Sequence, residues 1–166
     1  GMVFTPSDDP VQGAVEGTFS TSLVGLDHAR QPELVYVLRS GTEADAHGLP
    51  GLGLITGGVP VGGGMHGGLN RHEINTVLIL GGAARGGLPG LSEAPSGIID
   101  IAPTVLDLLG LDAPASMRGA SLTAAATRNH APTITSFEAG IGSFRQRLSV
   151  RRRGNHMFPV HGSRIG

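Results

Sequence analysis

The sequence lacks several residue types, and each absence excludes a class of protein. There is no cysteine, which excludes a disulfide scaffold and zinc sites built from thiolates. There is no lysine, so all twelve basic residues are arginine and the phosphate-binding loop Gly-x-x-x-x-Gly-Lys-Ser/Thr is impossible. Tryptophan is absent and there is one tyrosine, which leaves few rings to stack on nucleic-acid bases. No apolar run approaches the ~18 residues of a membrane span. We therefore predict neither a nucleic-acid nor a membrane partner.

Glycine is abundant instead, at 28 of 166 residues, whereas its usual share is about 7%. Charged residues make up 15%, against about 25% in an ordinary domain. A hydrophobic content of 39% together with this low charge argues against a disordered chain. The length suits one domain with its own hydrophobic core.

The charges are distributed unevenly along the chain. Residues 1–138 hold all thirteen acids and six arginines, a balance of −7, whereas residues 139–166 hold six arginines and no acid. Such asymmetry indicates either an anionic partner or a solvated pair of basic strands. We favour the solvated strands.

The first 29 residues are predicted to be an extended leader, because the segment is polar and rich in turn residues up to residue 22. Gly1 before Met2 is typical of a scar left by tag cleavage, and no signal peptide follows it. The localisation therefore stays open.

Two short continuous apolar runs, at 34–38 and 76–80, predict strands buried on both faces. Eleven glycines between residues 41 and 68 predict a long loop after the first run, and a second glycine loop extends to Gly97.

A helix is predicted between Asp100 and Gly110, since Asp100 is a fair N-cap and Ile101, Val105 and two leucines share one face. Residues 121–127 predict a short helix. Alternating residues from 144 to 151 predict a one-sided strand, paired with 157–160 in a hairpin that turns at Gly154-Asn155. The order predicts an α/β fold with a mixed sheet, whose site lies where the glycine loops follow the strands.

His66 is the strongest candidate ligand, because the glycines around it allow the backbone close to a metal and a neutral imidazole binds Zn²⁺. One histidine does not make a site. His72 is better explained as a surface residue, and the pairs Asp45/His47 and Asp27/His28 as loop and turn residues. The other histidines, His130, His156 and His161, show no partner. The nucleophile motif Gly-x-Ser-x-Gly is absent.

Two segments carry a family resemblance. The first is Met-His-Gly-Gly-Leu-Asn-Arg-His-Glu and the strand-like run after it, residues 65–82. The second is Asp-Ile-Ala-Pro-Thr-Val-Leu-Asp-Leu-Leu within residues 96–111, followed by Met-Arg-Gly-Ala-Ser-Leu at 117–122. Together they resemble the C-terminal part of the alkaline phosphatase superfamily, with the type I phosphodiesterases and nucleotide pyrophosphatases nearest and the sulfatases more distant. The resemblance covers about residues 30–125.

The resemblance implies a partial alkaline-phosphatase-like sandwich, in which residues 30–127 form the C-terminal α/β segment and residues 128–166 a basic terminal β-hairpin. The family site holds two zinc ions, and His66 matches its late histidine ligand. The nucleophile and the earlier ligands lie upstream of the matched part. Asp45-Ala46-His47-Gly48 does not reproduce the family's Asp-His-Gly, so no metal role transfers to it. Arg118 stands where the family has Asp. Asp100 is expected to cap the helix, and Asp107 to be a surface charge.

Three functions follow as expectations. The first is the C-terminal segment of a zinc-dependent phosphodiesterase or phosphatase, inactive alone and completed by an N-terminal half, whose parent enzyme takes a small phosphate ester. The second is a stand-alone module that forms homo-oligomers through surface left bare by the missing half. The third is an anion or nucleotide binder built on the glycine loops.

Overall fold

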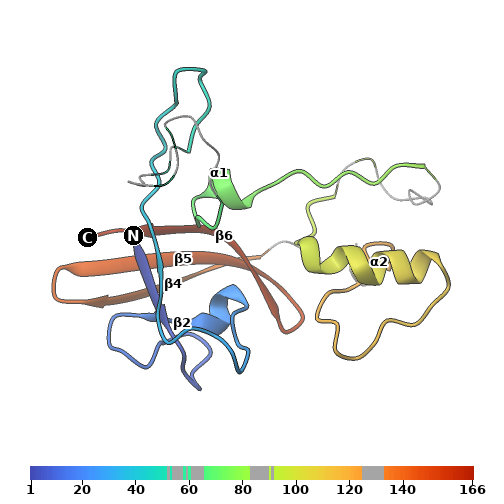
Figure 1. The fold of residues 1–166 in the computed structure, drawn as a ribbon, viewed down its shortest axis with the longest axis horizontal. Coiled ribbons are helices and arrows are strands. Elements are labelled where there is room, and N and C mark those ends of the chain that lie inside the picture. Colours follow the sequence, from blue (N-terminus) through green and yellow to red (C-terminus); the bar gives the residue numbers. More distant parts are fainter. Residues whose placement is uncertain are drawn as a thin grey trace. The chain divides into compact units, whose positions relative to one another are not determined.

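The computed structural model describes residues 1–51, 53, 58, 60, 66–82, 90, 92–124 and 133–166. It is an α/β structure with more strand than helix, and it contains a mixed three-stranded sheet and an antiparallel three-stranded sheet (Figure 1). The predicted α/β class, mixed sheet and C-terminal hairpin are confirmed. The chain divides into two compact units. Unit 1 comprises residues 1–76, 135–150 and 159–166, and unit 2 comprises residues 77–134 and 151–158.

The mixed sheet of unit 1 has the strand order β2-β1-β3. Its strands are β1 (Met2–Thr5), β2 (Phe19–Ser20) and β3 (Val35–Val37). Strand β1 runs parallel to β2 and antiparallel to β3. The unit also holds a 3₁₀ helix, η1 (Thr21–Val24), and a one-turn helix, α1 (Arg71–Ile74).

The N-terminal residues differ from the expected extended leader, because they supply much of the core of unit 1. Phe4, Phe19 and Leu23 are fully buried, and the two rings lie 6.0 Å apart between centroids. Turns close this arrangement, since Gly17 has a φ of 81° and the hydroxyls of Thr5 and Thr18 hydrogen-bond at 2.7 Å. The segment looked polar because its apolar residues are widely separated in the sequence, whereas the turns bring them together.

The first predicted strand is confirmed as β3, but it is not buried on both faces. Tyr36 at its centre is 67% exposed. The second predicted strand, at 76–80, is absent, and Val77 and Ile79 are each 82% exposed. An apolar run is buried on both faces only when other layers pack against both faces of its sheet, and the exposure of Tyr36 shows that one face of β3 is open.

The antiparallel sheet has the order β4-β5-β6. Its strands are β4 (Ile134–Ile141), β5 (Phe144–Arg153) and β6 (His156–Arg164). Gly142 and Gly154 adopt positive φ values of 55° and 57° in the two turns, as tight hairpins require. Every second residue of β5 from Gln146 to Val150 is buried, so the one-sided strand and its hairpin at Gly154 are confirmed.

The helix of unit 2 is also confirmed. A 3₁₀ turn, η3 (Ile98–Asp100), leads into α2 (Ile101–Leu108), and Gly110 follows with a φ of 69°. Its apolar face is uncovered, because Ile101, Val105 and Leu108 are all exposed. Of the short helix predicted at 121–127, residues 121–124 form a turn instead.

Several predicted features lie outside the described residues. These are residues 61–65 and 83–89 of the two glycine loops, residues 125–127 and His130. Within the described part of the chain, no helix is long and apolar enough to cross a membrane.

Candidate functional site

His66 lies exposed at the wall of a cavity of about 250 Å³ in unit 1. The other walls come from the end of β3 and the segment after it, from Gly67 and Gly68, and from Glu73 of α1. We call this cavity the His66 recess. No hydrogen bond or ion pair joins His66 to any residue that the structure describes, so its imidazole nitrogens are available to a ligand.

The recess is shaped by a capping box on α1. Asn70 accepts a hydrogen bond from the backbone N–H of His72 at 3.0 Å, and the Glu73 carboxylate accepts from the N–H of Asn70 at 3.3 Å. Both side chains also reach the segment that follows β3. Asn70 donates to the Gly41 carbonyl at 3.2 Å, and the Ser40 hydroxyl donates to Glu73 at 2.5 Å. The loop carrying His66 is thereby tied to the end of β3.

Sequence reasoning missed Asn70 and Glu73, although their spacing carried the signal. An Asn three residues before a Glu is a capping-box pattern, and it predicts a helix start at residue 71. Gly68 belongs to the same arrangement, since a Cβ there would lie 2.1 Å from a Glu73 carboxylate oxygen. Its role is therefore to let the loop pass close to that carboxylate.

The residues present do not complete a zinc site by themselves. Glu73 already accepts hydrogen bonds from the Ser40 hydroxyl and the Asn70 amide. Among the described lining residues, His66 carries the one imidazole of the recess. Among the described residues there is no group of three or more His, Asp or Glu that could hold a metal ion. Protein zinc sites use three or four ligands. A zinc ion at His66 would thus need ligands from outside the described residues.

The remaining candidate pairs are structural turns. Asp45 accepts hydrogen bonds at 2.8 Å from the backbone N–H groups of His47 and Leu49, so it organises a loop. His28 accepts the N–H of Arg30 at 3.1 Å, in the turn predicted there. His72 is an exposed residue of α1.

In unit 2, the two motif segments fold against each other through Asp100 and Thr104. One Asp100 oxygen accepts the N–H of Ala120, and the Thr104 hydroxyl accepts the N–H of Leu122, at 2.9 and 3.0 Å. Gly119 permits this approach, because a Cβ there would lie 2.0 Å from the Ile99 carbonyl oxygen. The segments Asp-Ile-Ala-Pro-Thr and Gly-Ala-Ser-Leu therefore form one local structure.

Asp100 differs from the expected helix cap. Its side chain caps no N–H of α2. Instead it accepts the N–H of Gly97 at 2.9 Å and pairs with Arg153 of β5 at 2.5 Å, while fully buried. Arg153 also donates to the Pro95 carbonyl at 2.6 Å, and its guanidinium lies 4.8 Å from the Phe158 ring centre. The Asp100 carboxylate can be buried because Arg153, which is distant in the sequence, supplies its counter-charge.

Asp107, the predicted surface charge of the helix, is exposed. It accepts hydrogen bonds from the hydroxyls of Ser121 and Thr123, which lower the pKa of its carboxyl group.

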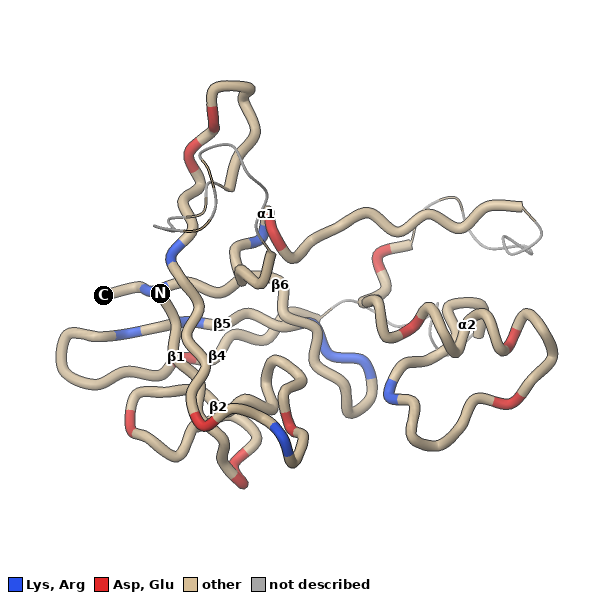
Figure 2. Tube along the Cα trace, viewed as in Figure 1, with Lys and Arg blue, Asp and Glu red and all other residues tan. Residues whose placement is uncertain are grey.

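The basic residues of the C-terminal strands are largely satisfied by the chain itself. They follow β5 and its turn into β6 (Figure 2). Arg147 pairs with Glu138 of β4 at 2.6 Å, and this pairing lowers the pKa of the Glu138 carboxyl group. Arg151 and Arg152 donate to the backbone carbonyls of Glu93 and Gly154. Of the basic strand pair that the sequence predicts to be solvated, Arg147 and Arg152 are exposed, whereas the Arg153 side chain is largely buried against Asp100.

Comparison with known proteins adds no relative. No family model matches the sequence, and searches of curated proteins and of solved structures each find no match.

Proposed function

We propose that this chain is the C-terminal segment of a zinc-dependent phosphodiesterase-type or phosphatase-type hydrolase with an alkaline-phosphatase-like sandwich. In this proposal His66 supplies one zinc ligand, and a complementing N-terminal half supplies the nucleophile and the other ligands. The observation that carries the proposal is the position of His66, an unpartnered and exposed imidazole in a recess at the end of a strand.

The packing of the motif segments in unit 2 also supports the proposal. Asp100 and Gly119 belong to the two parts of the second resemblance segment, residues 96–111 and 117–122, and these parts fold together through the hydrogen bond from the Ala120 N–H to the Asp100 carboxylate. The second segment thus forms one local structure. The apolar face of α2 is a further support, because in the proposed parent enzyme the missing half would cover it.

The first test uses the isolated chain with Zn²⁺. We expect no turnover of a chromogenic phosphodiester, since one imidazole gives weak metal binding and no nucleophile is placed. In an NMR titration, Zn²⁺ should shift the ring signals of His66, and His66→Ala should abolish that response. His47→Ala is the matched control, because His47 is also an exposed loop histidine. Zinc-dependent turnover lost in the His66 variant would disprove inactivity, and zinc binding unchanged in that variant would disprove the ligand assignment.

The second test concerns the complementing half. The DNA immediately upstream of Met2 should encode, in frame or in an adjacent gene, an Asp-His-Gly motif and a nucleophilic Thr or Ser. Coexpression of that polypeptide should restore phosphodiesterase activity that depends on His66. An upstream region without any such coding sequence would count against the proposal.

A second candidate function is a stand-alone module that forms homo-oligomers. The exposed apolar side chains of α2 favour it, since an uncovered helix face of this kind marks an interaction surface. Light scattering tests this candidate. Dimers that dissociate when Val105 and Leu108 are changed to Ser would support it, and a monomer at high concentration would reject it.

A further inference from the structure

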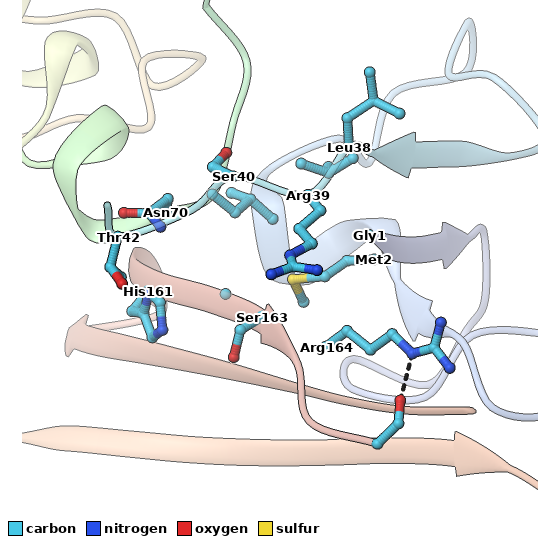
Figure 3. A pocket seen from close by; sticks show the side chains of 14 residues that line it. Gly1, Met2, Leu38, Arg39, Ser40, Thr42, Asn70, His161, Ser163 and Arg164 are labelled. Carbon is cyan, nitrogen blue, oxygen red and sulfur yellow. Dashed lines mark hydrogen bonds between the residues drawn. The ribbon is translucent and has the colours of Figure 1, made fainter. Parts of the chain in front are cut away.

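A second cavity of unit 1 has the character of an anion site. It has a volume of about 540 Å³, within the range of roughly 300–1,000 Å³ that is usual for small-molecule pockets. Its walls come from the start of β1, the segment after β3, the start of α1 and the end of β6 (Figure 3). We call it the Arg39 cavity.

The cavity carries two guanidiniums, and the terminal carboxylate of Gly166 in its wall offsets part of their charge. Arg39 and Arg164 line it, and none of the described lining residues is Asp or Glu. Burial, and after it the charges of Arg164 and Arg39, lowers the pKa of the Gly1 amino group, so both guanidiniums act on the same space.

The two arginines differ in the interactions that their guanidinium groups make. Arg164 donates to an oxygen of Gly166, and its guanidinium lies over the Phe144 ring at 5.6 Å. Arg39 has no hydrogen bond or ion pair within the described part of the chain. In Figure 3 it extends from the segment after β3 toward Met2. Judged on the described residues, the Arg39 guanidinium is therefore available to a ligand.

Neutral donors complete the polar side of the cavity. Thr42 and Ser163 contribute hydroxyl groups to its lining. His161 accepts the backbone N–H of Arg71 at its Nδ1, at 3.3 Å, so in the neutral ring the proton is on Nε2. Burial and the charges of Arg71 and His72 lower the pKa of His161, which favours this neutral, N–H-donating form. Met2, Val37 and Leu69 provide an apolar wall.

We propose that the Arg39 cavity binds a small organic phosphate. A guanidinium pairs with two phosphate oxygens at once, and the hydroxyls and the His161 N–H suit the remaining oxygens of a tetrahedral dianion. A carboxylate would leave most of these donors unused. The volume exceeds what a bare phosphate needs, so the organic group would lie against the apolar wall. This site needs no metal and does not use His66, although Arg39 also lines the His66 recess.

Phenylphosphonate, which is not hydrolysed, is the probe. Titrated with chelator present, it should shift the amide signals of residues 38–42 and 161–164 and give a calorimetric binding curve. Arg39→Gln should weaken binding at least tenfold, since a charge-assisted hydrogen bond is lost. Thr42→Val and Ser163→Ala should weaken it several-fold. Arg30→Gln is the matched control, because Arg30 is an exposed arginine of the same unit outside the cavity.

Three outcomes would overturn the proposal. They are no binding at millimolar phenylphosphonate, equal weakening by Arg39→Gln and Arg30→Gln, and benzoate binding as tight as phenylphosphonate. If Arg39→Gln fails to fold, the weaker binding of phenylphosphonate expected for Thr42→Val tests the proposal instead. His66→Ala should leave phenylphosphonate binding unchanged, so failure at this cavity and failure of zinc binding at His66 are told apart.

Discussion

The side-chain amide of Gln146 hydrogen-bonds the backbone of Val3 in both directions, as a neighbouring strand would. Its oxygen accepts the Val3 N–H at 2.9 Å, and its NH₂ group donates to the Val3 carbonyl at 3.0 Å and to the Gly17 carbonyl at 2.9 Å. Gln146 is fully buried. One residue of β5 thus satisfies two backbone groups of β1 and the Gly17 carbonyl in the segment before β2.

Changing Gln146 should destabilise unit 1 strongly. Gln146→Leu leaves these groups without a partner, at a cost of about 1–3 kcal/mol for each group that stays buried. Gln146→Glu should be at least as harmful, since a carboxylate would face two carbonyl oxygens. Urea unfolding measures both effects. Gln12→Leu, at an exposed glutamine, is the control and should change little. A Gln146→Leu variant as stable as the wild type would contradict this account.

Removing Arg153 should unfold unit 2 or weaken it severely. Arg153→Met leaves the buried Asp100 carboxylate without a counter-charge, which typically costs about 3–5 kcal/mol. Arg153→Lys should be intermediate, because a single ammonium cannot match both the carboxylate and the Pro95 carbonyl. Denaturant unfolding followed by NMR signals of unit 2 measures the loss.

The control for Arg153 is Arg147→Met, which breaks the exposed pair with Glu138 and should have little effect. Equal losses in the two variants would show that burial of the Asp100 pair does not matter to stability.

Gly119 should tolerate no side chain. Gly119→Ala forces a Cβ to within 2.0 Å of the Ile99 carbonyl oxygen, so the backbone must shift, at a cost of roughly 1–3 kcal/mol. Gly81→Ala is the matched control in the same unit, since a Cβ there meets nothing within 4 Å. Thermal unfolding should show a lower Tm for the first variant alone, and equal Tm values would refute the close approach.

The stability of unit 1 should fall as the pH drops below 6.5 because of His161. The pKa of His161 is lowered in the folded protein, so just below its usual value of 6.5 the unfolded chain binds more protons than the folded one. The stabilisation is fully present above pH 6.5 and declines until the pH reaches the lowered pKa. His161→Asn should flatten the dependence of unfolding free energy on pH between about pH 5 and 7. His47→Asn should keep it, and an unchanged slope in His161→Asn would reject the assignment.

Features encoded by neighbouring residues were predictable from the sequence. The helix from residue 101 and the turn at Gly154 follow from caps, glycine positions and local periodicity. The strand at 76–80 failed because its apolar run describes the side chains only, whereas a strand also needs a partner. The buried role of Asp100 could not be predicted, since it depends on Arg153, which lies 53 residues away. The recess beside His66 could not be predicted, because it depends on contacts of Asn70 and Glu73 with residues about 30 positions earlier in the chain.

The discontinuous composition of unit 1 sets the order in which the protein can fold. Residues 3 and 146 are separated by 143 positions, yet the buried backbone of β1 is satisfied only when β5 is present. During synthesis Phe4 can pack on Phe19 early, but the Val3 backbone groups stay without this partner until β5 has left the ribosome. Closing so long a loop before any contact forms is entropically costly, so unit 1 should be slow to fold and dependent on protection from aggregation until then.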